Sequence, residues 1–277
     1  MADETVIRKN PGKEKTEYVT TYRPSLLSSL PRKPQRQSLG IPDAGLPFRG
    51  LDEWNAYEFT WLNPKGKPEV AVLKFEVPCK SAHLIESKSL KLYLGSYSNT
   101  KFGHRSEVIS TLESDLSLAA QAPVSVSLLT PEHVLQTGLS VLHGTSLDTL
   151  DVEISEYYWD PSFLRVQSDT IVRESVFSHL FKSLCPMTGQ PDFASIHIQY
   201  AGRSINHEGL LKYLVSYRSH AEFAEQVTER IFVDIMNRCE PDRLTVHSHF
   251  TRRGGVDISS VRSHDDAPSA EVRLWRQ

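Results

Sequence analysis

The sequence predicts an α+β protein built from two similar units in tandem, each a four-stranded antiparallel sheet with two helices on one face. Apolar residues fall at every second position in several short segments, which is typical of strands, and at every third or fourth position in four others, which indicates helices. Residues 90–97 read LKLYLGSY, and residues 210–217, which lie 120 positions later (210 − 90), read LLKYLVSY. Both segments fall at the same point in the element order, so we interpret the chain as a tandem duplication.

The first 50 residues differ from the rest of the chain. They are polar, contain many prolines and serines, and carry a basic patch over residues 32–36. This composition is typical of a segment without a core of its own. We therefore expect an extended N-terminal arm over 1–50, pinned to the body near residues 46–51.

The first unit is expected over residues 51–165. Alternation predicts its strands, a fourfold spacing of Val108, Leu112 and Leu116 predicts its second helix, and Pro123 ends that helix. The expected elements are, in order, strands over 57–61 and 71–77, helices over 87–97 and 108–116, and strands over 124–128 and 152–154.

The second unit is expected over residues 166–277 and repeats that order. We expect residues 201–203 to turn the chain from its second strand into its first helix. The expected elements are strands over 176–184 and 196–200, helices over 210–215 and 223–235, and strands over 244–250 and 256–260. Open sheet edges need cover, so we expect a closed multi-subunit barrel, formed by a homodimer or a higher homo-oligomer.

Composition narrows the class of protein. The chain has 277 residues, 39% of them hydrophobic and 23% charged, and its net charge is −3. These values are ordinary for a soluble globular protein, and they argue against a surface built to bind nucleic acid. No apolar run is long enough to span a membrane and no targeting signal is evident, so we expect a cytoplasmic location. Three scattered cysteines exclude a disulfide framework.

Residues 183–192 (SLCPMTGQPD) form the first candidate site. Pro186, Gly189 and Pro191 favour a stiff loop that would hold Cys185 and Asp192 in a defined relation. One could act as nucleophile and the other as proton donor. A lone cysteine is more often an inert small hydrophobe, and the segment could be only a tight turn. On the loop alone, that structural interpretation is the stronger one.

Two basic segments form a second candidate site, for a phosphate-bearing ligand. Lys88 and Lys91 lie three apart on the expected helix and share a face, which suits a phosphate-bearing ligand but is equally typical of a solvated lysine face. Residues 252–255 (RRGG) are either a charged turn or a second phosphate contact. No G-x-G-x-x-G follows a strand, so a dinucleotide would not be held in the Rossmann manner.

Four motifs together resemble one family. Residues 86–93 (ESKSLKLY), 184–192 (LCPMTGQPD), 216–225 (SYRSHAEFAE) and 250–255 (FTRRGG) resemble, in order, four motifs of the QueF family. The members of that family are NADPH-dependent 7-cyano-7-deazaguanine reductases. The matches extend from about residue 45 to 263 in the order of the longer, tandem form.

The resemblance implies the tunnelling fold (T-fold), whose unit is the module that the periodicity predicts. It also implies an enzyme that reduces a nitrile to a primary amine with two NADPH, in the pathway to the modified tRNA base queuosine. Cys185 would add to the nitrile carbon and form a thioimide, which accepts hydride more readily. Asp192 would be the proton donor to the nitrile nitrogen, for which its pKa must be raised.

The family also implies binding roles. Glu86, Ser87 and Glu225 match positions that bind the substrate, the two carboxylates by accepting its paired N–H groups, and Phe223 matches an aromatic wall over the ring. For the glutamates a charge at a helix N-terminus is the alternative, and for Phe223 a place in the core. Lys88, Lys91 and Arg253 match the positions that hold the NADPH phosphates.

One departure from the family pattern concerns proton transfer. The family reads Phe-His-Glu where this chain has Ala224 between Phe223 and Glu225. The chain is therefore either a working enzyme with another proton route or an impaired variant that captures the nitrile and turns over poorly. His220, one helical turn earlier, is weak compensation. A related enzyme that adds ammonia to the nitrile is a third possibility, against which the phosphate-binding residues argue.

Two further histidines invite a metal interpretation. His247 and His249 share a strand face, but two ligands are too few for a zinc site and Cys239 lies too far away. We expect a surface pair and no metal.

Overall fold

The computed structural model describes residues 18–42, 45–265 and 272–277. Its main feature is one eight-stranded sheet in the order β5-β3-β2-β10-β9-β8-β7-β6, antiparallel except where β6 joins β7. The strands are β2 (Arg49–Leu62), β3 (Pro68–Pro78), β5 (Ser125–Leu129), β6 (Thr145–Ser146), β7 (Val166–Leu184), β8 (Pro191–Ile205), β9 (Arg243–Arg253) and β10 (Val256–Ser263). The expected α+β class with antiparallel strands is confirmed.

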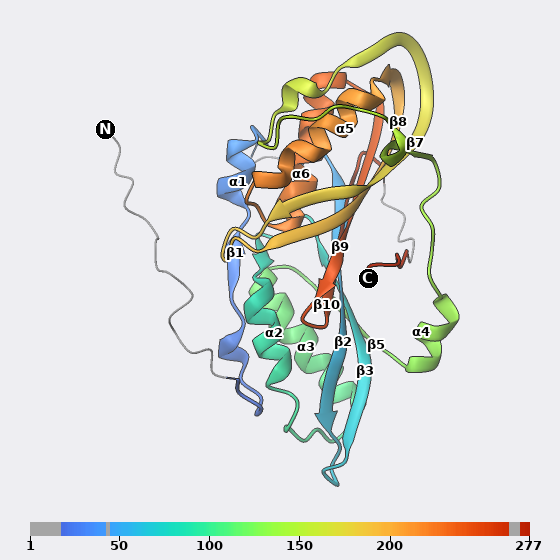
Figure 1. The fold of residues 1–277 in the computed structure, drawn as a ribbon. Coiled ribbons are helices and arrows are strands. Elements are labelled where there is room, and N and C mark those ends of the chain that lie inside the picture. Colours follow the sequence, from blue (N-terminus) through green and yellow to red (C-terminus); the bar gives the residue numbers. More distant parts are fainter. Residues whose placement is uncertain (1–17, 43–44, 266–271) are drawn as a thin grey trace.

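The helices are distributed unequally over the two faces of the sheet. Four pack along one face, and α4 lies on the other, near the C-terminal segment (Figure 1). They are α2 (Ser87–Gly95), α3 (Arg105–Ala120), α5 (His207–Ser216) and α6 (Ala224–Cys239), with α4 at Pro131–Thr137. Short 3₁₀ turns lie at Pro24–Leu26, Leu147–Thr149, Pro161–Phe163 and Tyr217–Ser219, and a short helix α1 is described below with the N-terminal segment. None of the helices described is long and apolar enough to cross a bilayer.

Burial follows the predicted periodicity. Helix α3 buries Val108, Leu112 and Leu116, and α6 buries a stripe of the same spacing against β9 and β10. The two halves are joined by backbone pairing, because β10 pairs with β2 over residues 256–263 and 49–56. The core therefore runs without a break under both helix pairs.

Two element predictions are wrong. Residues 152–154 form no strand; their apolar side chains pack against the core from a segment without regular structure. The extra strand in that region is the two-residue β6, which pairs with β7 at the far edge of the sheet. Residues 201–203 do not turn the chain, because Gly202 and its neighbours continue the pairing of β8 with β7.

The arm expected over residues 1–50 is not extended throughout. Its first 17 residues lie outside those described, but the rest contains strand β1 (Ser29–Pro31), which pairs with β4 (His83–Ile85), and helix α1 (Lys33–Ser38). Arg32 is only 2% exposed. A polar composition predicted an arm without packing, but here ion pairs with the body compensate for the burial of its charge.

Candidate active site

One pocket brings together most of the residues singled out in the sequence. It encloses about 570 Å³ between its lining residues, part of which is open to solvent. The start of α2, the loop after β7, the start of α6 and the turn between β9 and β10 all reach it. The predicted residues that line it are Ser87, Lys91, Cys185, Asp192, Phe223, Ala224, Glu225 and Arg253.

The backbone fixes the loop that carries Cys185. The Cys185 N–H donates to the carbonyl of Gln190 at 2.9 Å, and the Cys185 carbonyl accepts from Gly189 at 2.8 Å. Gly189 has a φ of 70°, which favours glycine. These bonds close a hairpin between β7 and β8, so Cys185 sits half-buried at a stiff turn. Asp192 lies on strand β8 rather than in the loop.

The base of this hairpin is tied to the start of α6. The Leu184 N–H donates to the carbonyl of His220 at 2.8 Å, and the Leu184 carbonyl accepts from Glu222 at 3.1 Å. The thiol and the first turn of α6 are therefore held in a defined relation on one side of the pocket.

Asp192 is the candidate acid. Burial raises the pKa of its carboxyl, while the nearby Arg253 and Lys91 lower it, and the net shift is upward. Arg253 forms an ion pair with Asp192 and donates to the carbonyl of Pro191 at 3.1 Å. A carboxyl with a raised pKa in the same pocket as a thiol is suited to donating a proton.

Glu225 is one of two buried carboxyls that line the pocket, in the first turn of α6 and 3% exposed; the other is Asp257 on β10, 2% exposed. Burial and the negative charge of Asp52 raise the pKa of Glu225 to about 7, against the positive charges of Arg32 and Arg262. The protonated and ionised forms of Glu225 are therefore both populated near neutral pH.

The family resemblance predicts substrate binding for both Glu86 and Glu225, but in the structure Glu86 is occupied by hydrogen bonds to a helix start. Its two carboxylate oxygens accept the backbone N–H groups of Lys88 at 2.8 Å and Ser89 at 2.7 Å, and so cap α2. Glu86 is not among the described residues that line the pocket. Lys88 is exposed and does not line it either.

A second hollow of about 770 Å³ adjoins the first and shares Lys91 and Val256 with it. Glu58, Ser98 and the glycines of the β9–β10 turn line it. Gly255 has a φ of 73°, and a Cβ there would lie 2.5 Å from the Glu58 side chain. The positive φ is what favours glycine in this turn, since the Glu58 side chain can move away from an added Cβ.

No histidine is among the described residues that line the pocket. Ala224 lies there, at the first position of α6. The His220 ring is instead hydrogen-bonded to Glu222 at 3.0 Å, and Glu222 also accepts two bonds from Arg230, both at 2.8 Å. His220 does not occupy the position left by the missing histidine.

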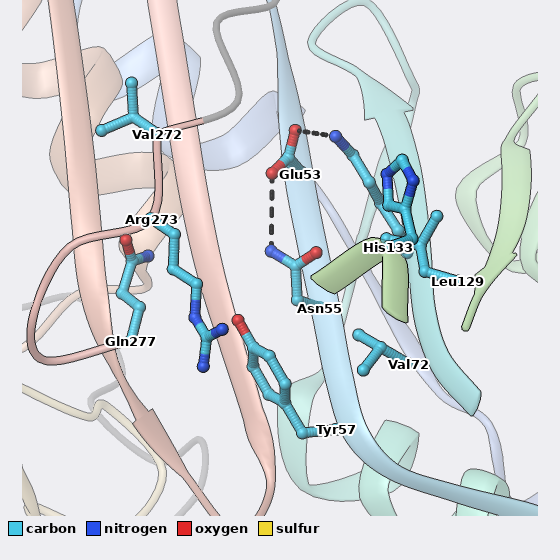
Figure 2. A pocket seen from close by; sticks show the side chains of 10 residues that line it. Glu53, Asn55, Tyr57, Val72, Leu129, His133, Val272, Arg273 and Gln277 are labelled. Atoms are coloured by element: carbon cyan, nitrogen blue, oxygen red, sulfur yellow. Dashed lines mark hydrogen bonds and ion pairs between the residues drawn. The ribbon is translucent and has the colours of Figure 1, made fainter. Parts of the chain in front are cut away.

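The other face of the sheet has a pocket of similar size, about 540 Å³, shown in Figure 2. Glu53, Asn55 and Tyr57 follow one another along β2 there, and Arg273 approaches from the C-terminal segment. Of the residues predicted from the sequence, none lines it. Glu53 is already paired with Lys74 at 2.9 Å, so the candidate site is the pocket that contains Cys185.

The expectation of a surface histidine pair is wrong. The rings of His247 and His249 lie 3.9 Å apart, and His249 is 2% exposed. Burial lowers the pKa of His247 to about 3, so it is neutral. Among the described residues no group of His, Cys, Asp and Glu side chains suits a metal ion.

Comparisons with known proteins identify the family of the chain. Residues 18–128 match the family model described as nitrile reductase, 7-cyano-7-deazaguanine-reductase N-term, and residues 191–269 match that of QueF-like protein. The NADPH-dependent 7-cyano-7-deazaguanine reductase of Burkholderia multivorans is 47% identical over 95% of this chain and 96% of its own. The chain belongs to the 7-cyano-7-deazaguanine reductase family.

A second relative supports the same assignment. The enzyme of that name from Bordetella avium is 46% identical over 94% of this chain and 95% of its own. The expected family and the expected class, an NADPH-dependent reductase, are therefore confirmed. The archaeosine synthase QueF-Like in the apo form overlaps 37% of this chain and 100% of its own at 20% identity, and its TM-score of 0.31 is too low to support an argument.

The sequence interpretation missed several residues in and around this pocket. Trp54 lines the pocket but escaped notice because a β-bulge between Ala56 and Phe59 changes the phase of alternation along β2. Arg32 was predicted only as part of a basic patch on the arm and Arg262 was not singled out, although both lower the pKa of Glu225. Their only signal was the charge of residues that are rarely buried.

Proposed function

We propose that the chain reduces the nitrile of 7-cyano-7-deazaguanine to the aminomethyl group of 7-aminomethyl-7-deazaguanine with two NADPH, through a thioimide on Cys185. The reductase role follows from the family. The convergence of Cys185, Asp192 and Glu225 on one pocket is the observation that carries the mechanism.

Atoms and charges balance when the Cys185 thiol adds to the nitrile at this site. The sulfur of Cys185 bonds to the nitrile carbon, one of the three carbon–nitrogen bonds breaks, and the nitrogen takes a proton. Asp192 donates that proton and the thiol proton replaces it, so no net charge is left. Lys91 and Arg253 would hold bound NADPH, which would supply one hydride to the thioimide carbon and a second to the imine left when the thiol departs. Each hydride would be matched by one proton from solvent to the nitrogen, so that the product is the neutral amine.

Glu225 binds the base in this proposal. Its carboxylate accepts the ring N–H and the exocyclic amino group together, while Phe223 and Ser87 face the ring. Support for Glu225 comes from its burial in the pocket. Glu86 keeps this role only if a ligand replaces the two backbone N–H groups that it accepts now.

The hollow beside the pocket is the proposed place for the cofactor. Lys91 lies between the two spaces and the β9–β10 turn borders both, so a phosphate bound by Lys91 and Arg253 would place the cofactor next to Cys185. Arg253 now pairs with Asp192. A phosphate that drew Arg253 away would remove the charge that lowers the Asp192 pKa and favour its protonated form. Lys88 would contact the cofactor only at the rim.

The architecture proposed for the chain is two T-fold units over residues 51–165 and 166–277, closed into a homodimer or a higher homo-oligomer. The open edges of the sheet at β5 and β6 support such an assembly. Sedimentation of the purified chain tests it, since a monomer would contradict the closed barrel.

A second candidate function is capture of the nitrile without efficient turnover. The absence of a histidine from the pocket-lining residues described favours it. Mixing protein, NADPH and the nitrile separates the two candidates: steady oxidation of two NADPH per amine supports the reductase, and a stable adduct without oxidation supports capture.

The variant Ala224→His refines that result. General acid–base catalysis contributes about 10²–10⁴-fold, so an impaired chain should gain a rate of that order. An unchanged rate would show that another group moves the protons, and Ala224→Ser is the matched control for a new polar group at this position.

A further inference from the structure

A buried network of charges extends from the N-terminal segment to the first turns of α6. Arg32 donates to Asp52 at 2.6 Å, and Arg262 donates to the other oxygen of Asp52 at 2.9 Å. Arg262 also contacts Glu229 at 3.0 Å, as Arg36 does at 2.7 Å. Arg32, Asp52, Glu229 and Arg262 are at most 2% exposed.

The charges of this network do not balance by themselves. The guanidinium groups of three arginines, which stay protonated, contact the carboxylates of only two acidic residues. The residues are Arg32, Arg36 and Arg262, and Asp52 and Glu229. Asp52 is ionised, because Arg262 and Arg32 lower its pKa to about 2 although burial alone would raise it. One positive charge remains, and burying an unbalanced charge is costly. Glu225 lies one helical turn before Glu229 on the same face of α6 and can balance it.

One N–H-bearing nitrogen of Arg32 has no hydrogen-bond partner among the described residues and is available to interact with Glu225. This nitrogen, Nη1, is buried and lies 3.6 Å from Glu229. The segment that carries Arg32 is fixed on both sides of the pocket. Strand β1 pairs with β4 just before α2, and Gln35 donates to Glu222 at 3.3 Å just before α6.

We propose that the buried Arg32–Asp52 pair positions Glu225 for the reaction, so that the N-terminal segment is part of the active site. Arg32 favours the ionised Glu225 carboxylate that accepts the two N–H groups of the base, Asp52 opposes it more strongly, and the two together set the pH at which Glu225 ionises. The proposal rests on the function proposed above for Glu225. Arg32 and Asp52 are positioning residues, because neither lines the pocket.

The test is the pH dependence of kcat/KM for the nitrile, whose limbs report groups of the free enzyme. Glu225 must be ionised to bind the base, so kcat/KM should fall as pH drops through its pKa of about 7. Glu225→Gln should remove this acidic limb and thereby assign it to Glu225.

Two variants should move the acidic limb in opposite directions. Arg32→Met removes a positive charge that favours ionisation of Glu225, so the midpoint of the acidic limb should move about one pH unit higher. Asp52→Asn removes a negative charge that opposes it, so the midpoint should move about as far to lower pH. Arg203→Met is the matched control: it removes a guanidinium outside the network, one that pairs with Glu240, and the limb should stay in place.

Several outcomes separate this inference from the proposed function. A wild-type chain that neither binds nor reduces the nitrile would contradict the proposed function itself. A working wild type whose limb stays in place in both Arg32→Met and Asp52→Asn would overturn only the role of the pair. If Arg32→Met does not fold by circular dichroism, Asp52→Asn decides alone, and an unmoved limb there overturns the inference.

Discussion

Each half of the chain contains two buried tyrosines and one aspartate whose side chains make the same two contacts. In both halves the tyrosine hydroxyls lie 2.7 Å apart, and the first donates to the aspartate at 2.6 Å. The triads are Tyr93, Tyr97 and Asp115 in the first half and Tyr213, Tyr217 and Asp234 in the second. This agreement supports the proposed duplication more strongly than the eight-residue match in sequence does.

The two helices that carry these aspartates, α3 and α6, also show where the halves differ. Helices α3 and α6 both have 16 residues and end at a residue in the left-handed conformation. The second and sixth residues of α6 are Glu225 and Glu229, both buried, whereas those of α3 are Ser106 and Ser110, both exposed. The scaffold is shared, and the site depends on a few replacements at helix starts and in one hairpin.

The hairpin thiol should give the largest effect, because the first half has no counterpart to it. Cys185→Ala should lower turnover at least about 10³-fold, since without sulfur the nitrile must accept hydride directly. NADPH oxidation followed by absorbance measures this. Cys239→Ala, a buried cysteine away from the pocket, is the control and should keep turnover. Turnover in Cys185→Ala close to that of the wild type would show that the halves differ in something other than the nucleophile.

Asp192 should give the next largest effect. Asp192→Asn should slow turnover about 10²–10⁴-fold, because an amide does not donate a proton as an acid does. Burial raises the pKa of Asp192, so the wild-type rate should fall as pH rises through that pKa and the proton is lost. The variant should lack this alkaline limb. An unchanged rate or an unchanged limb would remove Asp192 from the role of donor.

The shared triads should give the smallest effect, on stability rather than on turnover. Tyr213→Phe should lower the free energy of unfolding by about 1–3 kcal/mol, because Asp234 is buried and loses a donor. Tyr93→Phe should cost less, since Asp115 is partly exposed and water can replace the hydroxyl. Urea unfolding measures both. A larger loss for Tyr93→Phe would contradict this ranking of the two halves.

The helices and most strands were predictable because their signals are local. Val108, Leu112 and Leu116 define a stripe within three turns of one helix. The alternation of Val152 and Ile154 is equally clear, but a strand also needs a partner, and these residues have none among the described strands. The pairing of β2 with β10 joins residues about 200 positions apart, and no local pattern indicates it.

The site was predictable as far as its motifs extend. They named Cys185 and Asp192, but they gave Glu86 and Glu225 one role, and the structure separates the two because Glu86 is used as a helix cap. Arg32 was assigned to an extended arm because arginine is usually exposed. Its burial depends on Asp52, 20 residues away, and on Glu229, far along the chain.

The central claim is that the sulfur of Cys185 bonds to the nitrile carbon. Mass spectrometry of the intact protein after incubation with 7-cyano-7-deazaguanine and no NADPH tests it most directly. The account predicts a mass increase equal to the whole ligand in the wild type, located on the peptide that contains Cys185 and absent from Cys185→Ala. An unmodified wild type that still consumes NADPH, or an adduct on another residue, would contradict it.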